Sequence, residues 1–151
     1  MSSTVKLIFP EVISIKRSIV ILPDNLNPYR VSGFSARDGN FSLGIRSSYN
    51  KVYFRSHIAQ HNRNFALLEL FIKFFNCGVV YNRSITGRCD FIVQSKDHLC
   101  NIIIPHFSNY PFESIKMLDF LDFKRGMNIV VSGNIDSKID NIRDITTDRS
   151  A

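Results

Sequence analysis

The sequence predicts an α+β fold in the order αββαββα, with a four-stranded antiparallel sheet whose helices cover one face. Three observations support this fold class. Apolar residues recur at helical spacing in three stretches, they alternate with polar residues in two pairs of shorter segments, and turn-forming residues separate the members of each pair. Strands that alternate in this way have one covered face and one open face, which is typical of a half-buried antiparallel sheet.

The first element is a short helix over residues 28–38. Asn27 is suited to cap its start, and Pro28 is suited to its first position. Gly39 is expected to adopt the left-handed conformation just past its end. Asp38 stands at the carboxyl end, where the helix dipole is negative and favours a bound cation.

Small residues line one side of this helix. Ser32 and Ala36 are four residues apart, and Gly33 lies beside them. Glycine within a helix costs about 1 kcal/mol relative to alanine, a cost that makes sense if another backbone comes close. We therefore expect a tight contact with a second helix along this side.

Two strands follow and form a hairpin. Apolar side chains at every second position begin at Phe41 and again at Val52, and the intervening positions are polar and basic. Residues 47–50 supply the turn. A helix is then predicted over residues 64–75, ended by Gly78.

Two more strands are predicted near 79–84 and 88–95, and then a helix near 97–108. The last long helix, near 113–125, is expected to bury Ile115, Leu118 and Leu121.

The domain therefore spans residues 27–131. Residues 1–26 form an N-terminal extension, and residues 132–151 form a short amphipathic helix and a polar tail. The helix is indicated by isoleucines at i, i+4 and i+7, namely Ile135, Ile139 and Ile142.

Composition limits the class of protein. The chain has 151 residues, 44% hydrophobic content and 13 Phe, which favours one globular domain. Its apolar runs are too short to span a bilayer, and its three cysteines lack the spacing of a zinc site. The net charge of +6 arises in residues 1–112, which include the strands, and indicates either a polyanionic partner or ordinary solubility charge.

The segment Val31-Ser32-Gly33-Phe34-Ser35-Ala36-Arg37-Asp38-Gly39 resembles the motif of the LAGLIDADG homing endonucleases and maturases. The resemblance extends over residues 9–131, through Ile58–Asn64, Phe75–Gly78, Asp90–Val93, Ile102–Phe107 and Ser114–Phe123. It implies that Asp38 is a metal-binding catalytic residue, with Gly39 beside it in a site for Mg²⁺ or another divalent cation.

The segment Phe9–Ser14 resembles the linker between the two halves of double-motif members of that family. The chain is therefore similar to a second half standing alone. The resemblance implies that a second copy or another half packs against Ser32, Gly33, Ala36 and Arg37 and supplies a second acid. Two departures count against full activity. Ala36 replaces a usual acid, and Arg37 replaces a small residue where paired helices nearly touch.

The polar phase of the strands predicts a nucleic-acid interface. Arginine suits guanine and glutamine suits adenine in the major groove, and the remaining cations suit phosphates. A solvated sheet face is the simpler alternative. The candidate residues are Asn40, Ser42, Arg46, Ser48, Lys51, Tyr53, Arg55, His57, Tyr81, Arg83, Arg88, Asp90 and Gln94.

The leading hypothesis is a site-specific endonuclease unit that cleaves double-stranded DNA with Mg²⁺, as a homodimer or with a partner half. The resemblance favours an intron-homing protein encoded in a mitochondrial or other organelle genome. The alternative is a catalytically impaired binding module, either a maturase that holds intron RNA or a decayed half-enzyme. A structural nucleic-acid-binding protein is a third hypothesis. No membrane partner is expected.

Overall fold

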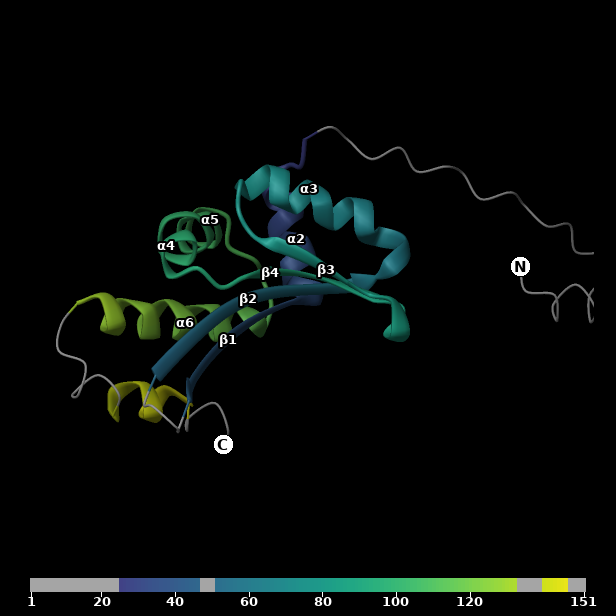
Figure 1. Cartoon of the computed structure of the whole chain (residues 1–151). Helices are drawn as coiled ribbons and strands as arrows, with labels where there is room; N and C mark the ends of the chain where they lie inside the picture. The colour runs from purple at the N-terminus through teal and green to yellow at the C-terminus, as the bar shows by residue number, and fades with distance from the viewer. Residues whose placement is uncertain (1–24, 47–50, 133–139, 147–151) are drawn as a thin grey trace, which may run out of the picture.

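The computed structural model describes residues 25–46, 51–132 and 140–146. Four antiparallel strands form one sheet in the order β1-β2-β4-β3, so that two hairpins lie side by side with β2 and β4 at the centre. Helices pack on one face of this sheet (Figure 1). The predicted fold class is confirmed. Among the described residues, none of the helices has the length and apolarity needed to cross a membrane.

The first helix, α2 (Pro28–Asp38), begins as expected. The Asn27 side chain accepts a hydrogen bond of 2.9 Å from the Tyr29 backbone N–H, and proline occupies the first turn. The predicted conformation of Gly39 is wrong, because its φ of −83° and ψ of 159° are extended. Strand β1 starts at Gly39 without a loop, and a Cβ there would lie 2.5 Å from the Ser35 carbonyl oxygen. Close approach is therefore the reason for this glycine.

The first hairpin consists of β1 (Gly39–Arg46) and β2 (Lys51–His61), and the register places Arg46 opposite Lys51. A 3₁₀ turn, η1 (Asn62–Asn64), leads into α3 (Phe65–Phe75).

This helix ends three residues before Gly78. Asn76 is left-handed, with φ of 53°, and Gly78 follows with φ of 94°. The second hairpin then consists of β3 (Val79–Arg83), the turn η2 (Ser84–Thr86) and β4 (Arg88–Val93).

The predicted helix near 97–108 is divided into three parts. These are α4 (Lys96–His98), the π-helical segment η3 (Leu99–Ile103) and α5 (Ile104–Asn109). The final long helix is α6 (Lys116–Val131), which extends beyond its predicted end.

Helix α6 buries a different side from the one predicted. Ile115, Leu118 and Leu121 are 82%, 62% and 47% exposed. The opposite stripe, Phe120, Phe123 and Met127, is buried instead. Both stripes have helical spacing, so periodicity along the chain does not distinguish them.

The core lies between the covered face of the sheet and these helices. Phe41 on β1 lies against the rings of Phe107, Phe112, Phe120 and Phe123, with centroids 5.2–6.3 Å apart. Residues 140–146 are helical, and Ile142 and Ile145 are buried. The other predicted isoleucines of that segment, Ile135 and Ile139, lie outside the described residues, as does the extension over 1–24.

Candidate active site and nucleic-acid interface

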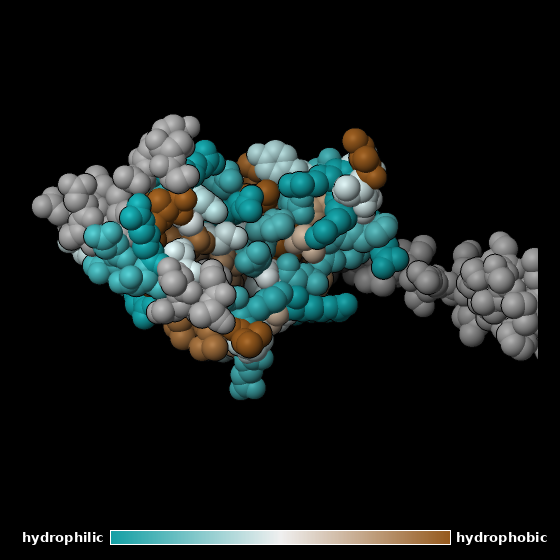
Figure 2. All heavy atoms as spheres, turned by 90° about the horizontal axis from the view of Figure 1, so that it is seen from below, coloured by the Kyte–Doolittle hydropathy of each residue, from teal (hydrophilic) through white to brown (hydrophobic). Residues whose placement is uncertain are grey.

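The strand register brings the predicted interface residues to the open face of the sheet. Directly opposed residues of antiparallel strands point to the same side. The opposed pairs on the open side are Asn40 with His57, Ser42 with Arg55, Arg46 with Lys51, Tyr81 with Asp90, and Arg83 with Arg88. Figure 2, a view of the molecule from below, shows hydrophilic side chains across the middle of this side. Of the predicted interface set, Ser48 lies outside the described residues.

A basic groove of about 740 Å³ lies at the edge of the sheet, beside the first half of β2, which β4 does not pair. Its lining combines open-face residues with Val52, Phe54 and Val130 of the covered side. The Tyr53 ring occupies the space above Gly44, where any Cβ would overlap it, and the Arg46 guanidinium lies 5.9 Å from the ring centroid. A cation and an aromatic ring side by side suit phosphates and bases. The polar residues that line the groove are Arg46, Lys51, Tyr53, Arg55, Gln94 and Lys96. Lys96, which follows the end of β4, was not among the predicted interface residues.

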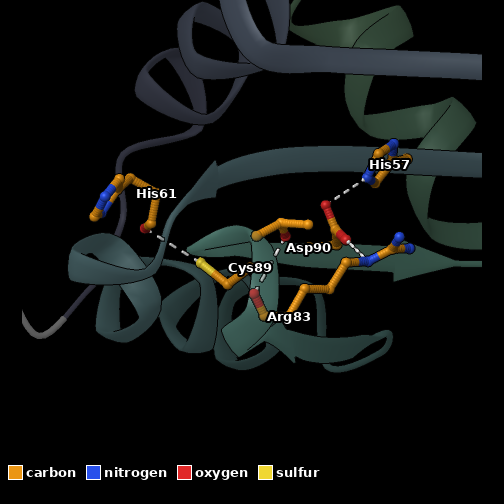
Figure 3. A network of polar contacts seen from close by, with 6 residues as sticks. His57, His61, Arg83, Cys89 and Asp90 are labelled. Carbon is orange, nitrogen blue, oxygen red and sulfur yellow. Dashed lines mark hydrogen bonds and ion pairs between the residues drawn. The ribbon is translucent and has the colours of Figure 1, made fainter.

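Asp90 differs from its predicted neighbours. It is 3% exposed, although it lies on the open face. Its carboxylate accepts from His57 Nε2 at 3.0 Å and pairs with Arg83 Nε at 2.5 Å, as the dashed lines of Figure 3 show. Asp90 lies on the open face, as predicted, but protein donors contact both of its oxygens. Its part in nucleic-acid binding stays a prediction.

Asp38 stands where α2 turns into β1, and its side chain is 27% exposed. Gln60 Nε2 donates a hydrogen bond of 2.7 Å to Asp38 Oδ2. Asn64 Nδ2 in turn donates to Gln60 Oε1 at 2.9 Å, which orients the glutamine amide toward the carboxylate. The Asp38 side chain is therefore fixed through one of its two oxygens.

The other oxygen, Asp38 Oδ1, lies 3.9 Å from Arg37 Nε, which is too far for a hydrogen bond. A second cation is close, because Lys116 Nζ donates to the Arg37 backbone carbonyl at 2.5 Å. Asp38 thus combines a partly exposed oxygen with neighbouring positive charge. An exposed carboxylate oxygen is a ligand that Mg²⁺ accepts.

Neither Gln60 nor Lys116 was among the predicted site residues. Gln60 carries a signal that could have been found, since it occupies a covered-face position of β2 where the alternation predicts an apolar residue. Lys116 carries no such signal. It reaches α2 only because the start of α6 packs beside the end of that helix.

The predicted helix contact is divided between two sides of α2. Ser32 is buried in its own domain, where Oγ donates to the Tyr110 carbonyl at 2.5 Å, and Ala36 packs against the core. Ser32 therefore does not face outward as expected. Gly33 and Arg37 do face outward, and they line a hollow of about 510 Å³. A Cβ on Gly33 would have no neighbour within 4 Å, so the described part of the fold does not require glycine there.

Asp38 does not belong to a cluster of metal ligands in the described part of this chain. Within residues 25–46, 51–132 and 140–146, no three His, Cys, Asp or Glu side chains gather closely enough to hold a metal ion. A divalent ion at Asp38 would need further ligands from water, from backbone or from another chain.

The profile of the LAGLIDADG endonuclease family matches residues 31–127. The chain is 34% identical over 142 residues to "Probable intron-encoded endonuclease 2" of Neurospora crassa, covering 86% of this chain and 30% of that protein. It is 30% identical to I-LtrWI, a LAGLIDADG homing endonuclease solved bound to target DNA. The TM-score is 0.82, and the match covers 96% of this chain and 51% of that one.

A second solved homing endonuclease of this family, I-GzeII in complex with its DNA target, is 27% identical with a TM-score of 0.79. The match covers 94% of this chain and 51% of that one. The chain thus spans about half of these solved chains and about a third of the Neurospora protein. It has the length of one half of a double-motif protein, and it contains one motif. The chain belongs to the LAGLIDADG endonuclease family.

Proposed function

We propose that the chain is one half of a site-specific endonuclease that hydrolyses double-stranded DNA with Mg²⁺ or another divalent cation. The observation that carries this proposal is the position of Asp38, which is held by Gln60 at the point where α2 joins a sheet with a basic open face. The DNA complexes of I-LtrWI and I-GzeII support a DNA substrate.

The described residues suggest a role for each side chain in phosphodiester hydrolysis. A bound divalent cation would activate a water molecule and neutralise charge on the phosphate. Asp38 Oδ1 would hold that cation, with the Gly39 backbone beside it, while Gln60 keeps the carboxylate in one orientation. The Lys116 ammonium, now on the Arg37 carbonyl, would stabilise negative charge on a scissile phosphate.

A second half would complete the site. The outer side of α2 offers Gly33 and an open hollow, into which a second helix would fit. The occupant is either a second copy or a different half. Arg37 opposes self-association, because a two-fold axis along α2 would bring two guanidiniums together.

Substitution of Arg37 tests the occupant. Arg37→Gly is expected to strengthen self-association in sedimentation, whereas Arg37→Lys, which keeps the charge, is expected to leave it unchanged. Equal sedimentation of all three proteins would remove the argument from charge and size.

Nicking of supercoiled plasmids tests the activity, with Mg²⁺ and a library of candidate intron-insertion sites. Asp38→Asn is expected to slow nicking by about 10³-fold or more, because it removes the metal ligand. Asp97→Asn, the same change of charge at an exposed residue of α4, is expected to behave like wild type. If wild type binds DNA without cutting any site, and Asp38→Asn binds equally, the endonuclease proposal fails.

The impaired binding module then becomes the better account, favoured by Arg37 and Ala36 in the motif. An RNA duplex of the same sequence would distinguish an intron-RNA partner, since the two duplexes differ in groove shape. Relatives are named as intron-encoded, one in an ND4 intron and one as Cox1-I1b. These names support an organelle-encoded, mitochondrial location.

A further inference from the structure

We infer that Asp90 determines base preference on the open face, by positioning Arg83 and His57 as one unit that reads a guanine next to an exposed amino group. This inference rests on the proposed function, because it assumes that the open face contacts duplex DNA. It assigns Asp90 a positioning role and not a contact of its own.

The unit spans three strands. In the register, Ala59 of β2 and Tyr81 of β3 flank Asp90 of β4 on the same face. His57 reaches Asp90 from β2 and Arg83 reaches it from β3, and the two contacts end on different oxygens of the carboxylate (Figure 3). Only 4% of the Asp90 side chain is exposed, whereas Arg83 is 58% exposed. The carboxylate therefore anchors two side chains whose outer parts remain accessible.

The anchor fixes what Arg83 presents. Its Nε is engaged with Asp90 Oδ2, so the direction of the guanidinium plane is set while its terminal nitrogens remain available. Two parallel N–H donors match O6 and N7 of guanine in the major groove. An arginine held in advance loses less side-chain freedom on binding than an unrestrained one.

The anchor also fixes the tautomer of His57. An ionised carboxylate only accepts hydrogen bonds, so the 3.0 Å contact requires the proton on His57 Nε2. In the neutral ring Nδ1 is then an acceptor. Acceptors on a protein pair with the amino groups of cytosine N4 or adenine N6. The His57 ring and the Arg83 guanidinium contact the same carboxylate. The guanine and the amino group that they read therefore belong to the same or adjacent base pairs.

Stability alone does not require a carboxylate at this position. Ile92, two residues further along the same face of β4, is 7% exposed and apolar. Replacement of a buried ion pair by packed apolar residues is often neutral or stabilising. A charged residue at Asp90 is therefore better explained by what it does to Arg83 and His57.

Selection of bound sequences from a randomised duplex library, with the full chain, tests the inference. Wild type is expected to enrich guanine about tenfold at one position, within the range of a bidentate arginine contact. Asp90→Asn is expected to reduce that enrichment to about twofold or less, without weaker binding to bulk duplex, because net positive charge increases. Asp97→Asn adds the same charge elsewhere and is expected to keep the wild-type preference.

Arg83→Lys provides a second variant if Asp90→Asn fails to fold, since Arg83 is largely exposed. Lysine keeps the charge but lacks the two parallel N–H donors of arginine. This variant is therefore expected to lose the preference for guanine at the same position. An unchanged preference in both folded variants overturns the inference and leaves the proposed function standing. If wild type enriches no sequence, the proposed function fails, and the inference fails with it.

Discussion

The two faces of the sheet come from the same four strands, yet they carry opposite kinds of side chain. The covered face presents Phe41, Phe54 and Phe91 to the helices, and the open face presents mainly polar and basic residues. Alternation along each strand separates them, so neighbouring residues serve different purposes. Stability and function can therefore be changed independently, one face at a time.

Gln60 and Asp90 depart from this division in an informative way. Gln60 occupies a covered-face position but bonds to Asp38, and Asp90 is buried on the open face between two donors. Proteins tend to depart from local rules at functional sites. Each exception therefore marks a place where the strand supports the chemistry proposed for its neighbours.

The largest expected effect on stability comes from the covered face. Phe41→Ala should lower the free energy of unfolding by about 3–5 kcal/mol, because Phe41 is buried among four aromatic rings and leaves a cavity. Denaturant unfolding measures this loss. DNA affinity corrected for the folded fraction should not change. A specific loss of affinity in the folded fraction would show that the two faces are coupled.

Gln60→Ala tests whether Asp38 needs the hydrogen bond from Gln60. Without the 2.7 Å hydrogen bond the Asp38 carboxylate is free to rotate, and the cleavage rate at saturating DNA should fall by roughly 10–100-fold, as for other residues that orient metal ligands. Affinity for DNA without divalent metal should remain at the wild-type value. An unchanged cleavage rate would mean that Asp38 needs no support from β2.

Acid should weaken the covered side through His106. Burial lowers the pKa of His106 to about 4, from the 6.5 expected in the unfolded chain. Between these values the unfolded chain binds a proton that the folded protein excludes, so stability falls as pH drops from about 6.5 toward 4. Denaturant midpoints at pH 7 and pH 5 measure the loss. His106→Phe should reduce that difference, and an equal difference in both proteins would exclude this histidine as the cause.

The smallest effect is expected from a single cation of the groove. Lys51→Gln should weaken DNA binding a few-fold and lower the salt slope by about 1, as loss of one phosphate contact predicts. Lys124→Gln makes the same change of charge on α6, where Lys124 bonds to Ser108 away from the open face. If both variants lose equal affinity, net charge and not the groove is responsible.

Much of the fold could be predicted because it depends on local patterns. The four strands, the helix over Phe65–Phe75 and the cap at Asn27 each follow from residues close together in the chain. The polar character of the open face was predicted from the alternation of polar and apolar residues along the strands. The predictions that proved wrong depended on contacts that the sequence does not show. Helix α6 buries the side whose phenylalanines pack over β1. Gly39 is required because the Ser35 carbonyl lies too close for a Cβ, and not because the chain turns there.

Spacing and composition are properties of the chain. They were therefore sufficient to predict the order of the elements, the basic character of one sheet face and the placement of Asp38 at a helix end. The folded structure was needed to show that Gln60 and Lys116 meet this helix end and that Asp90 is enclosed between His57 and Arg83. The physical reason is that hydrogen bonds and ion pairs act over a few ångströms. Arg83 and Asp90 are seven positions apart within one hairpin, but the other pairs are more than twenty positions apart. They come within that range only after the strands have paired and α6 has packed.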